Sequence, residues 1–475
     1  MKLVKSLLLG SAAGFVAMTG ASAADLPSRK AAPAEYVRVC SAYGAGFFYI
    51  PGSDVCLKVG GAAIFQYAYT EPAAHDASPL GMRALGRVEL DARNPTAYGT
   101  LRAFVRVNFL YRTGAEFSGS GPRQAIQMNS TAAADSGVAG RASTQVVLDK
   151  AFIQWGGLIA GRTNSLFAYN KNPEIIGVLP TDALFGTNMI GYIATFGGGF
   201  YASISAEDPI ARRQAVANAG DLRMVAPNGL SINGFANNVS VAGAITDANP
   251  AGSTQFYAGA RMPDIVGAIG VEQSWGGAQV SAAVHQIPTS YASGFSADSK
   301  YGWAVAGGVQ INLPMLAPGD YIWLNAAYAD GAMSYVHSNW SAAYLNNNAV
   351  KNSVAFYTAD AYVNPVTGGI SKSKTWAINA AMVHYWTPTL RSNFFGGYTE
   401  FDNPGNLADF RYWAVGTGLW WTPVRALDMG VDVAYQKIEA KGGGIVVQTT
   451  GVRNGQLSKS GDGAWLARFR ITRAF

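Results

Sequence analysis

Apolar and polar residues alternate along much of this chain, and the clearest example spans residues 82–93. One parity there is apolar or small, consisting of Met82, Ala84, Gly86, Val88, Leu90 and Ala92. The other parity is mostly charged, consisting of Arg83, Leu85, Arg87, Glu89, Asp91 and Arg93. A period of two is typical of a β-strand with two different faces, whereas an amphipathic helix would show a period of about 3.6.

Residues 100–112 repeat the pattern, so the two segments predict a long hairpin around a turn at 94–99. Its second strand has an apolar face of Leu101, Ala103, Val105, Val107, Phe109 and Tyr111, and a polar face of Thr100, Arg102, Phe104, Arg106, Asn108 and Arg112. The alternation recurs at 57–70, 278–287, 301–313, 427–435 and 465–475. In the last segment Trp465, Ala467, Phe469, Ile471 and Phe475 are expected on one face, opposite Arg468, Arg470 and Thr472.

The connections between these segments are short and long in turn. Short ones rich in Gly or Pro lie at 156–157, 197–199, 276–277, 314–320 and 387–388, and long polar ones span 112–144, 208–261, 330–372 and 441–462. This asymmetry is typical of outer-membrane barrels, which have short periplasmic turns and long external loops. The predicted fold is therefore all-β, an antiparallel transmembrane β-barrel of about sixteen strands. The segment 208–261 leaves room for one further hairpin.

The composition supports a membrane barrel rather than a bundle of membrane helices. Of the 475 residues 49% are apolar and only 13% are charged, and there are 56 glycines. Beyond the first 23 residues no stretch approaches the ~18 unbroken apolar residues of a membrane helix. Since every backbone polar group in a bilayer must be bonded within the protein, a closed sheet is the remaining solution.

The N-terminus predicts export. Lys2 and Lys5 precede a short apolar core at 7–16, and Ala21-Ser22-Ala23 supplies a small-x-small cleavage pattern, so residues 1–23 are expected to be a signal peptide. The two cysteines, Cys40 and Cys56, fall in the expected mature N-terminal segment, 24–56, and an oxidising compartment favours a disulfide between them over two free thiols. The barrel is expected to occupy 57–475.

Aromatic side chains gather near the expected strand ends. They are Trp386, Trp420, Trp421, Tyr435, Trp465 and Phe475. Such residues form girdles at both membrane interfaces, although ordinary core packing is an alternative. The terminal Phe475 also resembles the signal that the barrel assembly machinery recognises, while Arg473 departs from its general form.

A sixteen-stranded barrel encloses a water-filled lumen unless something plugs it. Residues 164–188, after the fifth strand, are expected to fold inward as a constriction loop and to carry Glu174 and Asp182 toward the lumen. Four arginines on inward parities would form a facing basic wall, namely Arg83, Arg87, Arg102 and Arg106. The field between loop and wall would orient polar solutes. The alternative is that these arginines only pair with Glu89 and Asp91.

Signatures of catalysis or metal binding are missing from the sequence. The four histidines, His75, His285, His337 and His384, lie in distant segments without metal-ligand spacing. His285 is expected to be a solvated lumen residue. We expect no enzyme activity, cofactor or metal, and the net charge of +6 is too small to indicate nucleic acid as a partner.

Several motifs resemble those of the general porins of alphaproteobacteria. The most specific is Glu35-Tyr36-Val37-Arg38-Val39-Cys40, followed by residues 43–52 and by Cys56-Leu57; residues 151–158, 262–267 and 468–470 are similar too. The resemblance implies a sixteen-stranded barrel of the Gram-negative outer membrane, usually a homotrimer, with its third external loop inside the lumen. It also implies passive diffusion of small hydrophilic molecules.

We therefore predict a passive diffusion pore for small hydrophilic solutes and ions. The expected partners are outer-membrane lipid and lipopolysaccharide, the assembly machinery and two further copies of the chain. One alternative is a solute-selective channel for sugars or anions. Others are a barrel hydrolase that depends on His285 or His384, and an adhesin that depends on the long loops.

Overall fold

A computed structural model provides the fold of this chain. It describes residues 38–71, 79–113, 142–171, 173, 186–213, 215–218, 259–289, 299–337, 354–355, 359–363, 369–404, 409–441, 447–448 and 461–475. The expected signal peptide, 1–23, lies outside these ranges. Among the helices in them, none is long and apolar enough to span a membrane.

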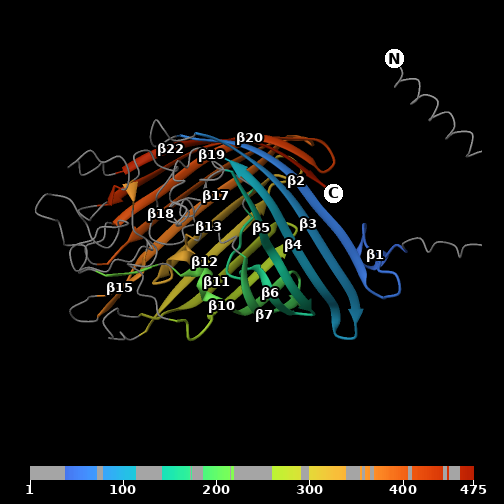
Figure 1. Cartoon of the computed structure of the whole chain (residues 1–475), viewed down its shortest axis with the longest axis horizontal. Helices are drawn as coiled ribbons and strands as arrows, with labels where there is room; N and C mark the ends of the chain where they lie inside the picture. Colours follow the sequence, from blue (N-terminus) through green and yellow to red (C-terminus); the bar gives the residue numbers. More distant parts are fainter. Residues whose placement is uncertain are drawn as a thin grey trace, which may run out of the picture.

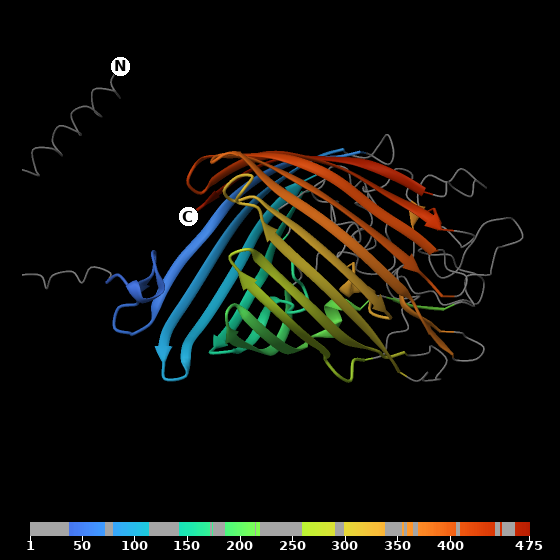
Figure 2. The ribbon, with the colours of Figure 1, turned by 180° about the vertical axis from the view of Figure 1, so that it is seen from behind.

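One large antiparallel sheet closes on itself to form the barrel (Figures 1 and 2). In the described residues its wall consists of sixteen strands, each paired with the next, and the last pairs with the first. In chain order they are β2 Cys56–Thr70, β3 Leu80–Thr96, β4 Gly99–Thr113, β5 Ala142–Trp155, β6 Leu158–Asn164, β7 Gly186–Gly197, β8 Phe200–Glu207, β10 Asp264–Gln273, β11 Gly276–Ile287, β12 Lys300–Asn312, β13 Tyr321–Asp330, β17 Lys374–Thr387, β18 Leu390–Asp402, β19 Asp409–Val424, β20 Leu427–Lys441 and β22 Gly461–Ala474. The predicted sixteen-stranded barrel is confirmed.

Short turns lie at one end of the barrel and long connections at the other. The turn between β3 and β4 holds only Ala97 and Tyr98, because the strands pair as far as Thr96 and Gly99. The turn predicted at 94–99 was therefore too long: Pro95 lies within β3, opposite Thr100. By contrast, the 56 residues 208–263 separate the end of β8 from the start of β10 without adding a wall strand among the described residues. The short-turn end is periplasmic and the other external.

The two faces of the wall differ as the alternation predicts. On β3, Met82 and Val88 point outward and are about half exposed, while Asp91 on the other parity is buried. The adjacent residues Trp420 and Trp421 show the same rule, because neighbouring residues of a strand face opposite sides. Trp421 is exposed on the outside, but Trp420 points inward and is buried, so its predicted place in an interfacial girdle was wrong.

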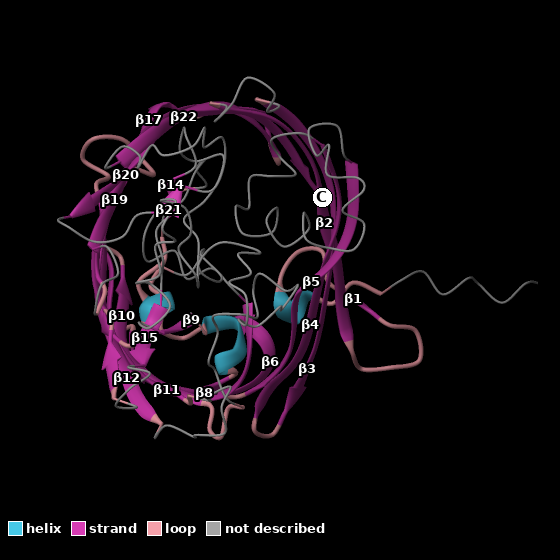
Figure 3. Ribbon diagram, turned by 60° about the vertical axis from the view of Figure 1, so that its left-hand side comes forward, coloured by secondary structure: helices cyan, strands magenta, loops and turns pink. Residues whose placement is uncertain are grey.

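Several short elements lie inside the ring of strands (Figure 3). They include the strands β9 Ala215–Asn218, β14 Val354–Ala355, β15 Ala359–Val363 and β21 Val447–Gln448. The connections also contain the 3₁₀ helices η4 Pro209–Arg212 and η6 Met333–Tyr335 and the strand β16 Ile370–Lys372, which directly precedes β17. β15 pairs with β9 in parallel and with β16 antiparallel, which makes a small second sheet. The connections after β8 and β13 therefore meet and form structure together.

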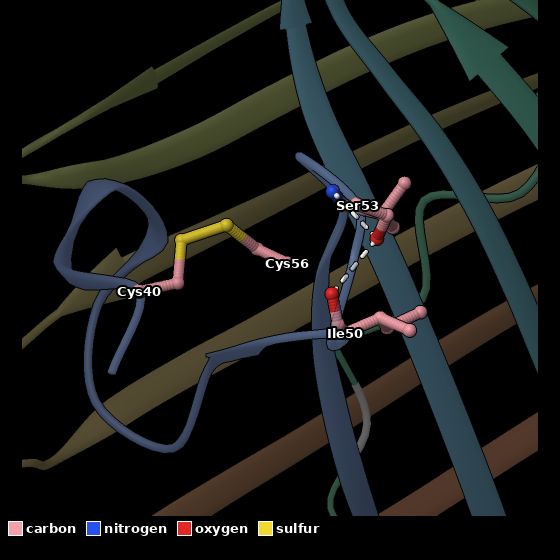
Figure 4. Close-up of a disulfide and its surroundings, with 5 residues drawn as sticks. Cys40, Ile50, Ser53 and Cys56 are labelled. Atoms are coloured by element: carbon pink, nitrogen blue, oxygen red, sulfur yellow. Dashed lines mark hydrogen bonds between the residues drawn. A yellow bond between two sulfur atoms is a disulfide. The ribbon is translucent and has the colours of Figure 1, made fainter. Parts of the chain in front are cut away.

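The described part of the N-terminal segment packs at the periplasmic end. It contains η1 Ser41–Tyr43 and β1 Phe48–Tyr49, and β1 pairs with the start of β2. Cys40 and Cys56 form the predicted disulfide, with 5.8 Å between their Cα atoms (Figure 4). The loop between them is tightened at Ser53, whose backbone N–H and hydroxyl both donate to the carbonyl of Ile50.

The other end of the chain closes the barrel. Phe475 exchanges two backbone hydrogen bonds with Gly61 of β2, and its side chain is exposed. The guanidinium of Arg473 donates to the carbonyl of Arg425 in the turn between β19 and β20. The terminal strand is thus paired along both of its edges, with β20 and with β2.

Candidate functional site

Arginines gather on the inner face of β22, β2, β3 and β4. The strand register places Arg470, Gln66, Arg83 and Arg112 side by side in one row around the ring. This row lies on the strand faces that the alternation predicted to point into the lumen. We call the inner face of these strands, with Arg83, Arg87, Arg102, Arg106, Arg112, Arg468 and Arg470, the arginine wall.

Four carboxylates neutralise part of the arginine wall: Asp91, Glu89, Asp149 and Asp432. Asp91 receives two hydrogen bonds of 2.9 Å from Arg102, and Arg93 grips the same carboxylate at 2.7 and 2.9 Å. Arg106 forms an ion pair with Glu89 at 2.7 Å. Two cations share Asp91, so this group keeps one positive charge.

Arg83 and Arg87 contact neutral side chains. Arg83 donates to the amide oxygen of Gln66 at 2.7 Å, and Arg87 donates to that of Asn108 at 3.0 Å. A neutral amide satisfies a guanidinium N–H without cancelling its charge. The alternative that the four predicted arginines only pair with Glu89 and Asp91 therefore describes Arg102 alone, because Arg106 also pairs with Asp149 at 3.4 Å, and Arg83 and Arg87 donate to amides.

The inner face of β10 to β13 is covered by other parts of the chain. Residues 165–171, the start of the connection after β6, lie against it. The carbonyl of Phe167 accepts from Gln279 and Ser281 of β11, at 3.1 and 2.7 Å, and the carbonyl of Tyr169 accepts from the Trp323 indole of β13 at 3.1 Å. The phenol of Tyr169 lies over Gly277 and Gly308, where a Cβ would clash with it. We call this region the covered wall.

The covered wall is held by a cluster of four buried polar side chains. Asp264 of β10 accepts from Nδ1 of His285 at 2.8 Å and from the Tyr335 hydroxyl of η6 at 2.7 Å. Nε2 of His285 lies 3.7 Å from the carboxylate of Asp360 in β15. We call Asp264, His285, Tyr335 and Asp360 the buried polar cluster; none of them is more than 1% exposed.

His285 thus differs from its prediction. It lies on the expected inner parity of β11, but it is not a solvated lumen residue, because η6 and β15 cover it. Both elements come from the connection after β13, more than 40 residues away in sequence. A strand pattern contains no signal for such a cover.

Further residues extend the covering layer. The ring of Phe167 meets that of Tyr335 edge-on at 4.8 Å, and the Arg212 guanidinium lies 4.1 Å from the centre of the Tyr335 ring. Burial raises the pKa of Tyr335 well above its ordinary value. Nearby, burial lowers the pKa of His337 to about 3, and its ring meets those of Phe401 and Tyr412 edge-on. Both side chains are therefore neutral at pH 7.

Glu174 and Asp182 lie outside the described residues, so their place relative to the arginine wall stays a prediction. Residues that the sequence analysis did not single out as site residues include Arg112, Arg470 and Gln66, although all three lie on the polar parities of their predicted strands. In the part of the chain that the structure describes, no group of three or more possible ligands could hold a metal ion.

The comparisons with known proteins decide the family. A family model described as the porin subfamily matches residues 25–460. The chain belongs to the porin subfamily. Porin Omp2b of Brucella melitensis is 29% identical over 379 residues, which cover 71% of this chain and 87% of that protein. Porin Omp2b of Brucella abortus is similar to the same extent. Brucella is alphaproteobacterial, so the resemblance seen in the sequence is confirmed.

A solved structure is similar in fold. The outer membrane channel DcaP of Acinetobacter baumannii superposes with a TM-score of 0.55 at 16% identity, covering 90% of this chain and 99% of that one. This likeness shows the fold. The family and its relatives make the chain an outer-membrane diffusion porin of a Gram-negative bacterium, as the sequence predicted.

Proposed function

We propose that the lumen passes small hydrophilic solutes and ions, down their gradients, between the arginine wall and the covered wall. The observation that carries this proposal is the unequal distribution of charge around the lumen. On one side Arg87 donates to an amide, and Arg93 and Arg102 share the one carboxylate of Asp91, so this side is net positive. On the other side the inner residues Gln279 and Ser281 carry no charge and lie under residues 165–171. A positive wall opposite one whose polar side chains are covered sets up a transverse field, which favours polar solutes over apolar ones.

The connection after β6 narrows this lumen in the proposal. Its first residues, 165–171, already lie against the covered wall, and Lys171 forms an ion pair with Glu272 at 2.9 Å. Continuing from there, Glu174 and Asp182 would face the arginine wall and complete an electrostatic constriction. The carboxylates would then pull cations to one side of the path and leave anions to the arginines.

The proposal includes no catalysis. His285 has a carboxylate on each side of its ring, at 2.8 Å from Nδ1 and 3.7 Å from Nε2, and is 1% exposed. To activate a nucleophile, the second ring nitrogen must face a hydroxyl that a substrate can reach. His384 bonds to the buried Asp320 at 2.6 Å near the periplasmic end. Both contacts favour structural roles.

We further propose that the chain assembles as a homotrimer in contact with outer-membrane lipid and lipopolysaccharide. Phe475 is proposed as the signal for the barrel assembly machinery. Its exposed side chain and its place at the end of the closing strand support this role. The porin subfamily supports the channel, and the homotrimer follows from the resemblance to alphaproteobacterial porins.

Single-channel recording tests the central proposal. Purified protein in a planar bilayer should show stable ohmic conductance that needs no ligand or energy source, and trimers should close in three equal steps. Reversal potentials in a salt gradient give the ion preference. A preparation that is folded, as judged by heat-dependent migration on gels, but passes no current would contradict the proposal. Channels that close in a single step after each insertion would contradict the trimer but not the pore.

A further inference from the structure

A β-bulge in β5 turns two adjacent charged side chains toward the lumen. Arg106 of β4 lies opposite Lys150 of β5. The next residue of β4, Val107, lies opposite Leu148, so Asp149 is an extra residue in the ladder. Partners across a ladder point to the same face, which places Lys150 inward with Arg106, and Asp149 also contacts Arg106. In a regular strand the two charges would alternate, and one of them would face hydrocarbon.

Arg106 engages both carboxylates of this region. It lies 2.7 Å from Glu89 on one side and 3.4 Å from Asp149 on the other. Lys150 is in a different situation, because it forms no hydrogen bond or ion pair with any residue that the structure describes. Its side chain is only partly buried. The bulge thus brings into the lumen a cation whose charge no direct contact cancels.

A second cation without a carboxylate partner lies across β4. The Nε atom of Arg87 donates to the Asn108 amide oxygen at 3.0 Å, and within the described residues Arg87 has no ion pair. Asn108 lies one inward position to the external side of Arg106. Lys150 is close enough to Arg87 and Arg106 to be repelled by both. Three cations with two carboxylates leave one excess positive charge here.

The donors of this region converge from three neighbouring strands. Arg87 lies on β3, Asn108 on β4 and Lys150 on β5, and these strands lie side by side (Figure 1). The bond to Asn108 uses only Nε of Arg87, so the two terminal nitrogens of the guanidinium are left to donate. The ammonium of Lys150 and the amide nitrogen of Asn108 add further donors. A ligand that satisfies all three side chains needs several acceptor oxygens and a negative charge.

A phosphate group meets these requirements. A phosphate monoester carries about two negative charges at pH 7 and three acceptor oxygens, and both Arg and Lys bind it well. Chloride brings one charge on a single atom and cannot bridge donors on three strands. A dianion between Lys150, Arg87 and Arg106 would also relieve their mutual repulsion.

We propose that Arg87, Asn108 and Lys150 bind the phosphate group of small phosphorylated solutes as they pass through the lumen. We call these three residues the phosphate station. The proposal rests on the proposed function, which assigns anions to the arginine wall, and names a class of anion and its place on that wall. The side chains of Arg87 and Lys150 are only partly buried, so the ligand stays partly hydrated. Binding is then weak enough for release, as conduction requires.

Competition with chloride tests the phosphate station. Chloride current through single channels is recorded at the reversal potential of potassium while glycerol 3-phosphate is added at constant ionic strength. A bound phosphate should repel chloride, so the wild-type current should fall to a saturating level. Lys150→Gln should need about fivefold more glycerol 3-phosphate for half of this effect, as expected when one partly exposed charge contact is lost. Lys150→Arg keeps the charge and should behave like wild type.

Lys58→Gln is the matched control. It removes the same charge from the inner parity of β2, nearer the periplasmic end, where Lys58 lies against Gly46 and Phe47. It should change the reversal potential in a KCl gradient but not the glycerol 3-phosphate concentration of half effect. Equal shifts of that concentration in Lys58→Gln and Lys150→Gln would mean that the general field of the lumen acts and would overturn the station.

Succinate tests the class of anion. Its two charges lie on separate carboxylates, so only one charge and two oxygens reach the station at a time, and it should compete more weakly than glycerol 3-phosphate. Equal competition by succinate would overturn phosphate as the preferred group. A chloride current that glycerol 3-phosphate does not change would overturn the station itself. A channel that passes no ions would instead contradict the proposed function.

Discussion

The arginine wall and the covered wall lie on opposite sides of one ring of strands, and both are built from the same alternation. On the arginine wall, Arg87, Arg102 and Arg106 of β3 and β4 face the lumen and remain partly accessible. On the covered wall, Asp264 and His285 face the same lumen but are almost completely buried. Asp264 and His285 thus occupy the same inward parity as Arg102, but water reaches Arg102 and not the other two.

This difference shows that the alternation determines which way a side chain points but not whether solvent reaches it. A charge that faces an open lumen costs little, since water and neighbouring ions solvate it. A charge under a folded segment must be bonded on every side, because an unsatisfied buried charge is costly. The covered wall should therefore be sensitive to the loss of one partner and the arginine wall tolerant of it.

Replacing Asp264 should have the largest effect. Asp264→Ala leaves His285 and Tyr335 without their shared acceptor, and breaking such a buried pair costs about 3–5 kcal/mol. The cost should appear in the covering segments, as faster hydrogen exchange of backbone amides at 165–171 and 331–337. Asp428→Ala is the control, since its ion pair with Arg391 is partly exposed and should be worth no more than about 1 kcal/mol. Equal exchange in the two variants would contradict the contrast between the walls.

The second-largest effect is expected from acidification, which should loosen the covered wall. His337 keeps a pKa of about 3 in the folded protein because it is buried, whereas an opened segment would take up a proton below its ordinary pKa of 6.5. The opened form thus binds more protons between these values, and the free energy of opening falls as the pH is lowered. At pH 4 the loss from this group is about 3 kcal/mol.

The measurement is hydrogen exchange at 331–337, at pH 7 and pH 4, after correction for the intrinsic rate. His337→Gln is neutral at both pH values and should lose most of this pH dependence. If the variant keeps the full dependence, other groups open the segment and the role given to His337 is wrong.

The extent of sequence prediction follows the same contrast. Period-two alternation was enough to place Arg83, Arg87, Arg102 and Arg106 on the inner parities and to give sixteen strands. It could not show that His285 is buried, because its cover comes from η6 and β15, whose sequences show no strand period. Local chemistry determines direction along a strand, while contacts between distant connections determine what fills the lumen.

A smaller effect is expected from single charges of the arginine wall. Arg102→Gln leaves Asp91 with Arg93 alone and removes the one excess positive charge of this group. Losing a unit positive charge about 10 Å from the path in water raises the energy of a passing anion and lowers that of a passing cation by roughly 0.4 kcal/mol each, so the anion-to-cation permeability ratio should fall about fourfold. Reversal potentials in a KCl gradient measure this ratio.

Asp91→Asn is the opposite change and should raise the same ratio by a similar factor, since Arg93 and Arg102 then both keep their charge. Arg473→Gln serves as a control, because Arg473 bonds to the turn carbonyl of Arg425 at the periplasmic end, outside the lumen. Shifts of the same sign in the two lumen variants would mean that altered packing, and not charge, sets the preference.

The smallest effect on the channel is expected from the disulfide. Cys40→Ala with Cys56→Ala removes a bond that closes a loop of 16 residues outside both walls. The chain-entropy cost for such a loop is about 3 kcal/mol, but it falls on the segment before β2, which Phe47 and the cation–π contact of Arg93 still hold in place. Conductance and reversal potential should stay at their wild-type values, while trypsin should cut after Arg38 or Lys58 sooner. A changed reversal potential would mean that this segment, at the periplasmic mouth, also shapes the ion path, and the two-wall description would then need a third charged region.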